Sequence, residues 1–378
     1  MPAPIGPLDP PQRLLCGPGP ANVHPSVLAA MQKPMLGHVD PDLHAILGEV
    51  IELLQAGFQR SDGLTIAVSG TGTMGVEAGV VNLVEPGEKV IIGAAGYFGF
   101  RLQEIARRRG AEVIEVNDDW GQAVSNDRLL GALAEHPDTR LLAVVHAETS
   151  TGVEHPLEEL AGAMAGSETL LMADCVTSFG AIELRAEPWG IDYCASCTQK
   201  GLAAPPGMSP IAVSPRALER IAARQAPVGY YMDLGMIADY WTRRAYHHTA
   251  PILHIYALHE ALRLALEEGW EARLARHLDA GRYFQAAVRD RGLELVADPA
   301  RQLPQLTAIR MPEGIDGKTV QERLLLEHGI EVGGGLGPAA PPMLRVGLMG
   351  ENATRETADI VLDALDAVLS KVTAGVPG

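Results

Sequence analysis

Short runs of consecutive apolar residues recur through the first half of the chain and alternate with segments of helical character. The runs lie at residues 64–68, 90–92, 113–116, 141–145 and 170–173. Unbroken apolar runs of this length are typical of strands buried on both faces, and the spacers are long enough for crossover helices. The pattern predicts an α/β protein with a mostly parallel, mixed sheet in a large domain.

The pattern changes after Pro251. Residues 252–290 predict a long helical stretch, strand-like runs follow at 307–311 and 344–348, and a closing helix is expected at 354–372. A smaller C-terminal α+β domain is the simplest arrangement of these elements. The predicted division is therefore an N-terminal arm rich in proline and glycine at 1–20, a large domain at 21–254 and a small domain at 255–378.

Composition and charge narrow the classes of partner. The chain has 378 residues, of which 47% are hydrophobic, and its 30 basic against 47 acidic residues give a net charge of −17. This charge argues against nucleic acid and anionic membrane surfaces as partners. Four cysteines are too few for a disulfide framework, and the sequence has neither a signal-peptide pattern nor an apolar run that could span a bilayer. A cytoplasmic location is expected.

A glycine-rich stretch, Ser69-Gly-Thr-Gly-Thr-Met-Gly75, separates the first predicted strand from a helix expected over 76–84. A dinucleotide site would need an acidic residue at the end of the next strand, and residues 90–96 contain no carboxylate. The backbone amides of Thr71, Gly72 and Thr73 at a helix start suit a single phosphate. An NAD-dependent dehydrogenase is therefore only a distant alternative.

Asp174 follows a buried strand, and Lys200 lies further along in the run Thr198-Gln-Lys200-Gly. A carboxylate at the end of an apolar strand is costly to bury unless a cation meets it there. The protonated ring nitrogen of pyridoxal 5'-phosphate is such a cation. With this cofactor, Asp174 would keep the ring nitrogen protonated and Lys200 would form the Schiff base with the aldehyde.

Two further strand ends carry candidate residues. Phe98, between Gly96 and Gly99, could stack on a flat cofactor ring, although a core aromatic would look the same. The polar run His146-Ala-Glu-Thr149-Ser-Thr-Gly follows the strand at 141–145. Ligand sites in open α/β sheets lie at such carboxyl ends.

Taken in order, the motifs resemble the alanine–glyoxylate and serine–glyoxylate aminotransferases, which are class V pyridoxal phosphate enzymes of fold type I. The resemblance implies that an amino group moves from alanine or serine to glyoxylate, by a ping-pong route through a Schiff base on Lys200, to give glycine and a 2-oxo acid. The stretches that match are the glycine-rich loop, the run from His146, Asp174-Cys-Val-Thr-Ser, Thr198-Gln-Lys200-Gly-Leu-Ala-Ala-Pro-Pro-Gly, Tyr246-His-His-Thr249 and Leu344-Arg345-Val-Gly-Leu.

The resemblance also implies roles for individual residues. Thr71, Gly72, Thr73 and Gln199 match phosphate contacts, Phe98 and Val176 match residues on the two faces of the ring, and Thr149 matches a small hydroxyl residue near the reacting centre. Tyr246 and Thr249 match residues that reach the phosphate of the neighbouring subunit's cofactor, which implies a homodimer with shared active sites. Arg345 matches the arginine that binds the substrate carboxylate. The chain departs from the family at Phe98, where many members have tryptophan, and at Thr73, where some have histidine.

The sequence also permits other functions within this class of enzymes. Ureidoglycine could be the amino donor. A class V desulfurase or lyase would share the fold, but that group typically has histidine where this chain has Gln199. No metal is expected, because Cys194 and Cys197 have no second cysteine pair, and the histidines between 247 and 259 lack a ligand motif.

Overall fold

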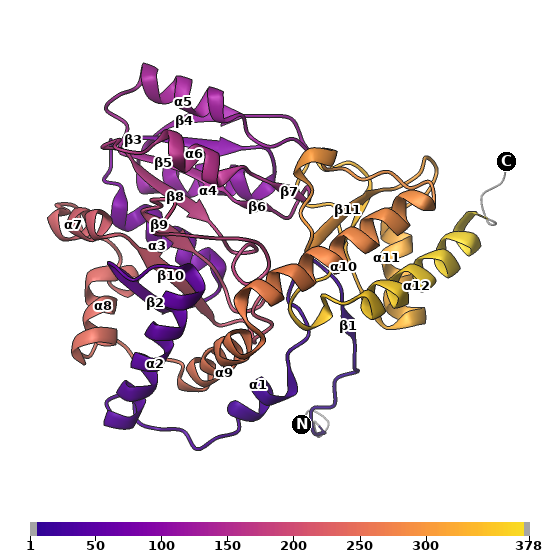
Figure 1. The fold of residues 1–378 in the computed structure, drawn as a ribbon, viewed down its shortest axis with the longest axis horizontal. Coiled ribbons are helices and arrows are strands. Elements are labelled where there is room, and N and C mark those ends of the chain that lie inside the picture. The colour runs from indigo at the N-terminus through magenta and orange to yellow at the C-terminus, as the bar shows by residue number, and fades with distance from the viewer. Residues whose placement is uncertain (1–5, 374–378) are drawn as a thin grey trace, which may run out of the picture.

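The computed structural model describes residues 6–373, and a seven-stranded sheet forms the centre of its larger part (Figure 1). The strand order is β2-β10-β9-β8-β5-β3-β4. In this sheet β10 runs antiparallel to both of its neighbours, and the other pairs are parallel. The predicted mostly parallel α/β sheet is confirmed. The strands are β2 (Leu64–Ser69), β3 (Lys89–Ala94), β4 (Glu112–Asn117), β5 (Leu141–Val145), β8 (Leu170–Asp174), β9 (Tyr193–Ala195) and β10 (Met208–Val213).

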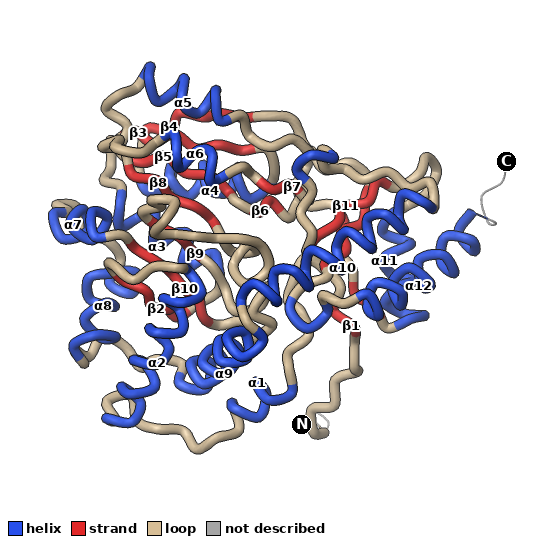
Figure 2. The backbone as a smooth tube through the Cα atoms, in the orientation of Figure 1, coloured by secondary structure: helices blue, strands red, loops and turns tan. Residues whose placement is uncertain are grey.

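Helices cover both faces of this sheet (Figure 2). Local signals fix their ends: Asp40 caps α2 and Pro41 opens it, and α4 ends at Gly110, whose φ is 87°. The helix predicted over 76–84 begins earlier, at Gly72, because the chain turns at Gly70, with φ 139°, directly after β2. The helices are α1 (Pro25–Ala30), α2 (Pro41–Phe58), α3 (Gly72–Leu83), α4 (Tyr97–Arg109), α5 (Asn126–Glu135), α6 (Leu157–Ala163), α7 (Pro215–Ala223) and α8 (Leu234–Arg243).

The long helical stretch predicted over 252–290 is two helices, α9 (Ile252–Glu268) and α10 (Trp270–Asp290). They are separated by Gly269, whose φ is 86°. Ile255, Leu258 and Leu262 of α9 are fully buried in the hydrophobic core of the large sheet. By packing, α9 therefore goes with the larger part of the molecule, although the predicted boundary at 254/255 assigned it to the small domain. The exact division into domains stays a prediction.

The C-terminal part has its own hydrophobic core around a three-stranded antiparallel sheet of order β11-β14-β13. The N-terminal segment joins this part, because β1 pairs in parallel with β12. In the connection between β5 and β8 of the large sheet, β6 (Ala147–Glu148) and β7 (Val153–Glu154) form a short antiparallel pair. The elements here are β1 (Leu14–Leu15), β11 (Leu306–Arg310), α11 (Gly317–His328), β12 (Ile330–Glu331), β13 (Gly333–Gly334), β14 (Met343–Gly347) and α12 (Arg355–Thr373). Within residues 6–373, no helix combines the length and apolar character needed to cross a membrane.

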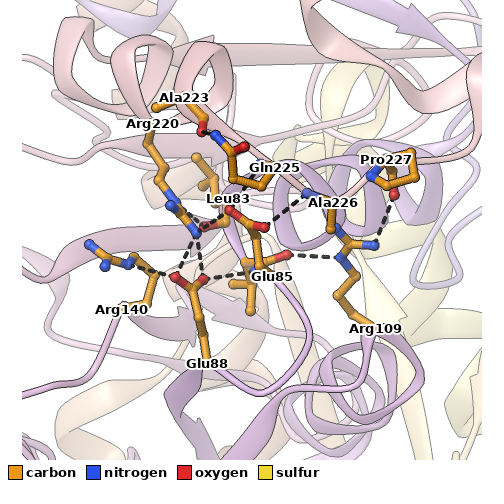
Figure 3. Close-up of polar contacts among 11 residues, drawn as sticks. Leu83, Glu85, Glu88, Arg109, Arg140, Arg220, Ala223, Gln225, Ala226 and Pro227 are labelled. Carbon is orange, nitrogen blue, oxygen red and sulfur yellow. Dashed lines mark hydrogen bonds and ion pairs between the residues drawn. The ribbon is translucent and has the colours of Figure 1, made fainter.

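A polar network fastens the segment after α7 to the turn between α3 and β3 (Figure 3). Arg220 reaches Glu88 at 2.6 Å, and Arg140 reaches the same carboxylate at 3.2 Å. Glu85 accepts hydrogen bonds from the backbone N–H groups of Gln225 and Ala226 at 3.2 and 2.9 Å. Since charged hydrogen bonds to backbone groups hold a loop firmly, this network sets the path of the chain toward Tyr230 and Tyr231.

Gly281 offers a test of packing between α10 and the loop that precedes β11. A Cβ at this position would lie 2.0 Å from the carbonyl oxygen of Pro304, which is backbone. We expect Gly281→Ala to lower the free energy of unfolding by about 1–3 kcal/mol, because a tightly packed site resists an added methyl group. Gly48 in α2 has no atom within 4 Å of its Cβ position. There Gly48→Ala is expected to stabilise by up to about 1 kcal/mol through helix propensity. Denaturant unfolding measures both changes, and equal effects would contradict the packing argument.

Candidate active site

A cavity of about 130 Å³ opens at the carboxyl ends of β5 and β8. Its position matches the rule that ligands bind where parallel strands end. The structure brings together here the predicted site residues that lie on the loops of the large sheet, namely Thr71, Gly72, Thr73, Phe98, Thr149, Asp174, Val176, Gln199 and Lys200. Their individual roles stay predictions.

Asp174 is the last residue of β8, and its side chain is 3% exposed. One carboxylate oxygen, Oδ1, accepts a hydrogen bond from the N–H of Val176 at 3.0 Å. The other, Oδ2, lies 3.9 Å from Nη2 of Arg101. Burial raises the pKa of Asp174, and the Arg101 charge and the Val176 hydrogen bond offset part of this rise. The carboxylate is therefore expensive to keep charged and would bind a cation well.

Lys200 lies in the loop between β9 and β10, and its Nζ donates to the carbonyl oxygen of Pro18. Burial lowers the pKa of Lys200, which favours the neutral amine that a nucleophile needs. Gly19 lies against this side chain, because a Cβ there would be 2.4 Å from Cδ of Lys200. The N-terminal segment was predicted to be an arm that precedes the fold. Its residues 17–20 instead cover the lysine.

Helix α10 also binds the loop that contains Lys200. Arg273 donates to the carbonyl oxygen of Gly201 at 2.6 Å, and Glu268 accepts from the same guanidinium at 2.7 Å. One turn later, Arg276 donates to the carbonyl oxygen of Gly350 in the C-terminal part at 2.9 Å. The same helix therefore contacts the lysine loop and the C-terminal part.

The N-terminus of α3 points its first backbone N–H groups at the cavity. Thr71 is the N-cap residue but makes no capping hydrogen bond, so the helix start lacks a side-chain acceptor. Gly72 must be small here, because a Cβ would lie 2.7 Å from Cγ2 of Val176. Oε1 of Gln199 is buried and has no hydrogen-bond partner. A phosphate at α3 and a protonated ring nitrogen at Asp174 would satisfy this set of groups, so the residues fit pyridoxal phosphate.

Arg101, which lines the cavity, and Glu148, which lies beside its residues Ala147 and Thr149, have roles that sequence reasoning missed. Glu148 is 6% exposed, and its Oε2 accepts the N–H groups of Phe98 and Gly99 at 3.1 Å, which caps α4. Ser150 donates to the other oxygen at 2.6 Å. Arg101 donates to Oγ1 of Thr73 at 3.1 Å, and its guanidinium carbon lies 4.6 Å from the centre of the Phe98 ring. The available signal for Arg101 was its spacing of three residues from Phe98, which puts both on one face of α4.

Arg345 on β14 reaches from the C-terminal part toward the cavity but does not line it. Its Nε donates to the carbonyl oxygen of Gly334 at 2.6 Å, and its Nη1 donates to the carbonyl oxygen of Thr149 at 3.1 Å. Burial lowers the pKa of Arg345 to about 10, so the side chain stays charged at neutral pH. A buried cation beside a cavity residue suits the recognition of a carboxylate.

Tyr246 and Thr249 lie outside the cavity of their own chain. Tyr246 is 59% exposed and packs its ring 5.2 Å from that of His38, and Thr249 is exposed as well. The structure of one chain therefore does not bring these two predicted residues to the other site residues. Their predicted role at a neighbouring subunit stays a prediction.

Between them, His247 and His248 form a directed chain of hydrogen bonds. Nε2 of His247 lies 2.9 Å from the carbonyl oxygen of Tyr230, which can only accept, so this nitrogen carries a proton. In neutral rings, Nδ1 of His247 then accepts from Nδ1 of His248 at 2.8 Å, and Ser69 donates to Nε2 of His248 at 2.8 Å. The 246–249 segment is thereby tied to Ser69, the first residue of the glycine-rich stretch. Within residues 6–373, no group of three or more histidine, cysteine or acidic side chains could hold a metal ion.

The comparisons with known proteins agree with this geometry. The family model for class-V aminotransferases matches residues 15–357. The chain is 38% identical to the alanine–glyoxylate aminotransferase of Oryctolagus cuniculus, with 96% of this chain and 94% of the relative covered. It is 35% identical to the (S)-ureidoglycine–glyoxylate transaminase of Bacillus subtilis (strain 168), with 97% and 92% covered. Among solved structures, the alanine–glyoxylate aminotransferase from Nostoc sp. superimposes with a TM-score of 0.94 at 47% identity, with 97% of each chain covered. The predicted fold class is confirmed.

Proposed function

Because the chain belongs to the class-V aminotransferases, we propose that it is a pyridoxal phosphate-dependent transaminase that moves an amino group from alanine or serine to glyoxylate. The family confirms the predicted resemblance and enzyme class, implies dependence on pyridoxal phosphate, and rules out the dehydrogenase reading. The observation that carries the proposal is that Lys200, Asp174 and the start of α3 line one cavity. Glyoxylate as acceptor is supported by the names of the relatives.

Pyridoxal phosphate, when bound, supplies an electron sink for the carbon that loses its proton. The chain would hold it at three places. The backbone amides at the start of α3 and the side chain of Gln199 would bind the phosphate, Asp174 would keep a proton on the ring nitrogen, and Phe98 and Val176 would pack on the ring faces. Because Asp174 is buried, its charge acts on that proton without screening by bulk water.

Lys200 would bond covalently to the cofactor at rest and then serve as the acid–base group. Nζ of Lys200 would be the group that removes the α-proton of the substrate and later returns it. Burial lowers the pKa of Lys200. This shift keeps more of the amine neutral near physiological pH, and only the neutral amine can accept a proton.

Arg345 is proposed to bind the carboxylate shared by the amino donor and glyoxylate. We expect Arg345→Lys to lower kcat/KM for both substrates by about 100-fold, mostly through KM, because an ammonium cannot replace the two parallel hydrogen bonds of a guanidinium. Arg310→Lys on the adjacent strand β11 is the matched control, since Arg310 has an exposed pairing with Glu294. Steady-state kinetics would contradict the assignment if both variants behaved alike.

A homodimer with shared sites is part of the proposal. Exposed tyrosines surround the segment that contains Tyr246 and Thr249, with Tyr230 and Tyr231 61% and 45% exposed. Large exposed apolar rings that gather on one face favour a protein partner there. Light scattering should give twice the chain mass at assay concentration, and a monomer would contradict the shared site.

A cytoplasmic location is likewise proposed, and cell fractionation tests it.

Assays of the purified protein with glyoxylate and a panel of amino donors test the function directly. Alanine or serine should support glycine formation with parallel-line ping-pong kinetics. (S)-Ureidoglycine is the second candidate donor, because the Bacillus subtilis relative has that name. Absence of activity with all three donors in a protein that binds pyridoxal phosphate would refute the glyoxylate assignment.

A further inference from the structure

Among the described residues, Asp174 has a single ion-pair partner, Arg101 of α4. The distance of 3.9 Å between Nη2 and Oδ2 is short enough for strong attraction in a buried site but too long for a hydrogen bond. Lys200, the other nearby cation, donates instead to Pro18. Arg101 is therefore the cation nearest to the buried carboxylate of Asp174, and it offsets the cost of burial together with the Val176 hydrogen bond and a smaller contribution from Lys200.

The guanidinium of Arg101 also contacts Phe98, which is proposed to pack on a face of the cofactor ring. It lies over the Phe98 ring, with 4.6 Å from its carbon to the ring centre. A guanidinium is a flat, delocalised cation that stacks on aromatic faces. Arg101 thus makes the two contacts, with an aromatic face and with Asp174, that a protonated pyridine ring would make.

We propose that Arg101 is the counter-cation of Asp174 in the cofactor-free protein and gives up this contact when the ring nitrogen of pyridoxal phosphate takes its place. The inference rests on the proposed function. Oδ1 of Asp174 already accepts the N–H of Val176, so the ring nitrogen would meet Oδ2, the oxygen nearer to Arg101, and the two cations would repel each other there. The Arg101 side chain is 24% exposed, so it has a route to solvent. Its hydrogen bond to Thr73 links its position to the glycine-rich loop.

A double-mutant cycle on cofactor affinity tests the exchange. The proteins are the wild type, Arg101→Met, Asp174→Asn and the double variant, each stripped of cofactor and titrated with pyridoxal phosphate while absorbance is recorded. If Arg101 and the ring compete for Asp174, Asp174→Asn should weaken binding by about tenfold more in the Arg101→Met background than in the wild type. Arg101 could also attract the phosphate of the cofactor independently of Asp174. Such an effect is the same in both Asp174 backgrounds and cancels in the cycle.

Unfolding of the cofactor-free proteins supplies a second readout. Arg101→Met should lower the melting temperature when Asp174 is present and should have a much smaller effect in the Asp174→Asn background. Arg108→Met is the matched control on α4, because Arg108 is 77% exposed and pairs only with Glu104 in the described residues. Its effect should be the same in both backgrounds.

The outcomes separate the two proposals. Equal weakening of cofactor binding by Asp174→Asn in both backgrounds would overturn the exchange and leave the proposed function intact. A wild-type protein whose spectrum does not change with pyridoxal phosphate would overturn the proposed function and the exchange together. An effect of Arg101→Met on the melting temperature that is the same with and without the Asp174→Asn substitution would show that the two side chains are not partners.

Discussion

Replacement of Lys200 by alanine is expected to abolish transamination, with kcat reduced by at least about 10⁴-fold. Three functions are lost at once: the covalent bond to the cofactor, the base that removes the α-proton and the acid that returns it. Arg345 cannot take over the proton transfer, because it stays charged at neutral pH, and Asp174 is assigned to the ring nitrogen. The measurements are steady-state rates and the absorbance between about 410 and 430 nm that covalently held pyridoxal phosphate gives.

The control for this experiment is Lys318→Ala, which removes an ammonium whose side chain is 79% exposed on α11. That variant should keep wild-type rates and spectrum. Retention of either turnover or the absorbance band by Lys200→Ala would contradict the central role given to this lysine.

Asp174→Asn is expected to lower kcat by about 10³-fold while the protein remains folded. The amide is nearly the same shape and can still accept the Val176 hydrogen bond through its oxygen. It has no charge to hold a proton on the ring nitrogen, so the electron sink weakens. Rapid-scan kinetics of the half-reaction with alanine would report the loss in the proton-transfer step.

Asp192→Asn separates this loss from a general effect of buried aspartates. Asp192 is 1% exposed, accepts from the N–H of Leu171 at 2.8 Å and pairs with Arg216. Its replacement should lower thermal stability, because a buried pair loses one partner, and should leave kcat of the folded enzyme nearly unchanged. Similar losses of kcat in both variants would argue against a specific role for Asp174.

Much of the fold follows from local pattern. The five apolar runs coincide with β2, β3, β4, β5 and β8. Four of these strands are buried, which explains their unbroken apolar character, whereas the edge strand β4 is largely half-buried or exposed. Where the predicted elements were wrong, the cause is also local. Gly269 divides one apparent helix into α9 and α10, and its left-handed backbone was not distinguishable in sequence from a tolerated helical glycine.

The candidate site could be predicted where the type of a residue and its place in the sequence pattern already indicate its chemical role. A lysine, an aspartate and a glycine-rich helix start are such features, and all three line the cavity. Glu148 and Arg101 were missed because their partners are set by tertiary contacts. Glu148 accepts the N–H of Phe98, which lies 50 residues before it, and Arg101 contacts Asp174 at the end of a strand far along the chain. Conversely, Tyr246 and Thr249 lie outside the cavity of their own chain, because their proposed role depends on a second subunit.

The cover over Lys200 has a practical consequence for protein engineering. Residues 13–22 are bound in place, with Asn22 linked to the backbone of Arg13 and Leu15 at 2.9 and 2.8 Å and Pro18 accepting from the lysine. Trimming this stretch to obtain a smaller crystallisation target would expose the reactive amine to bulk water and remove a strand from the C-terminal part. Fusion partners are therefore better not inserted within residues 13–22.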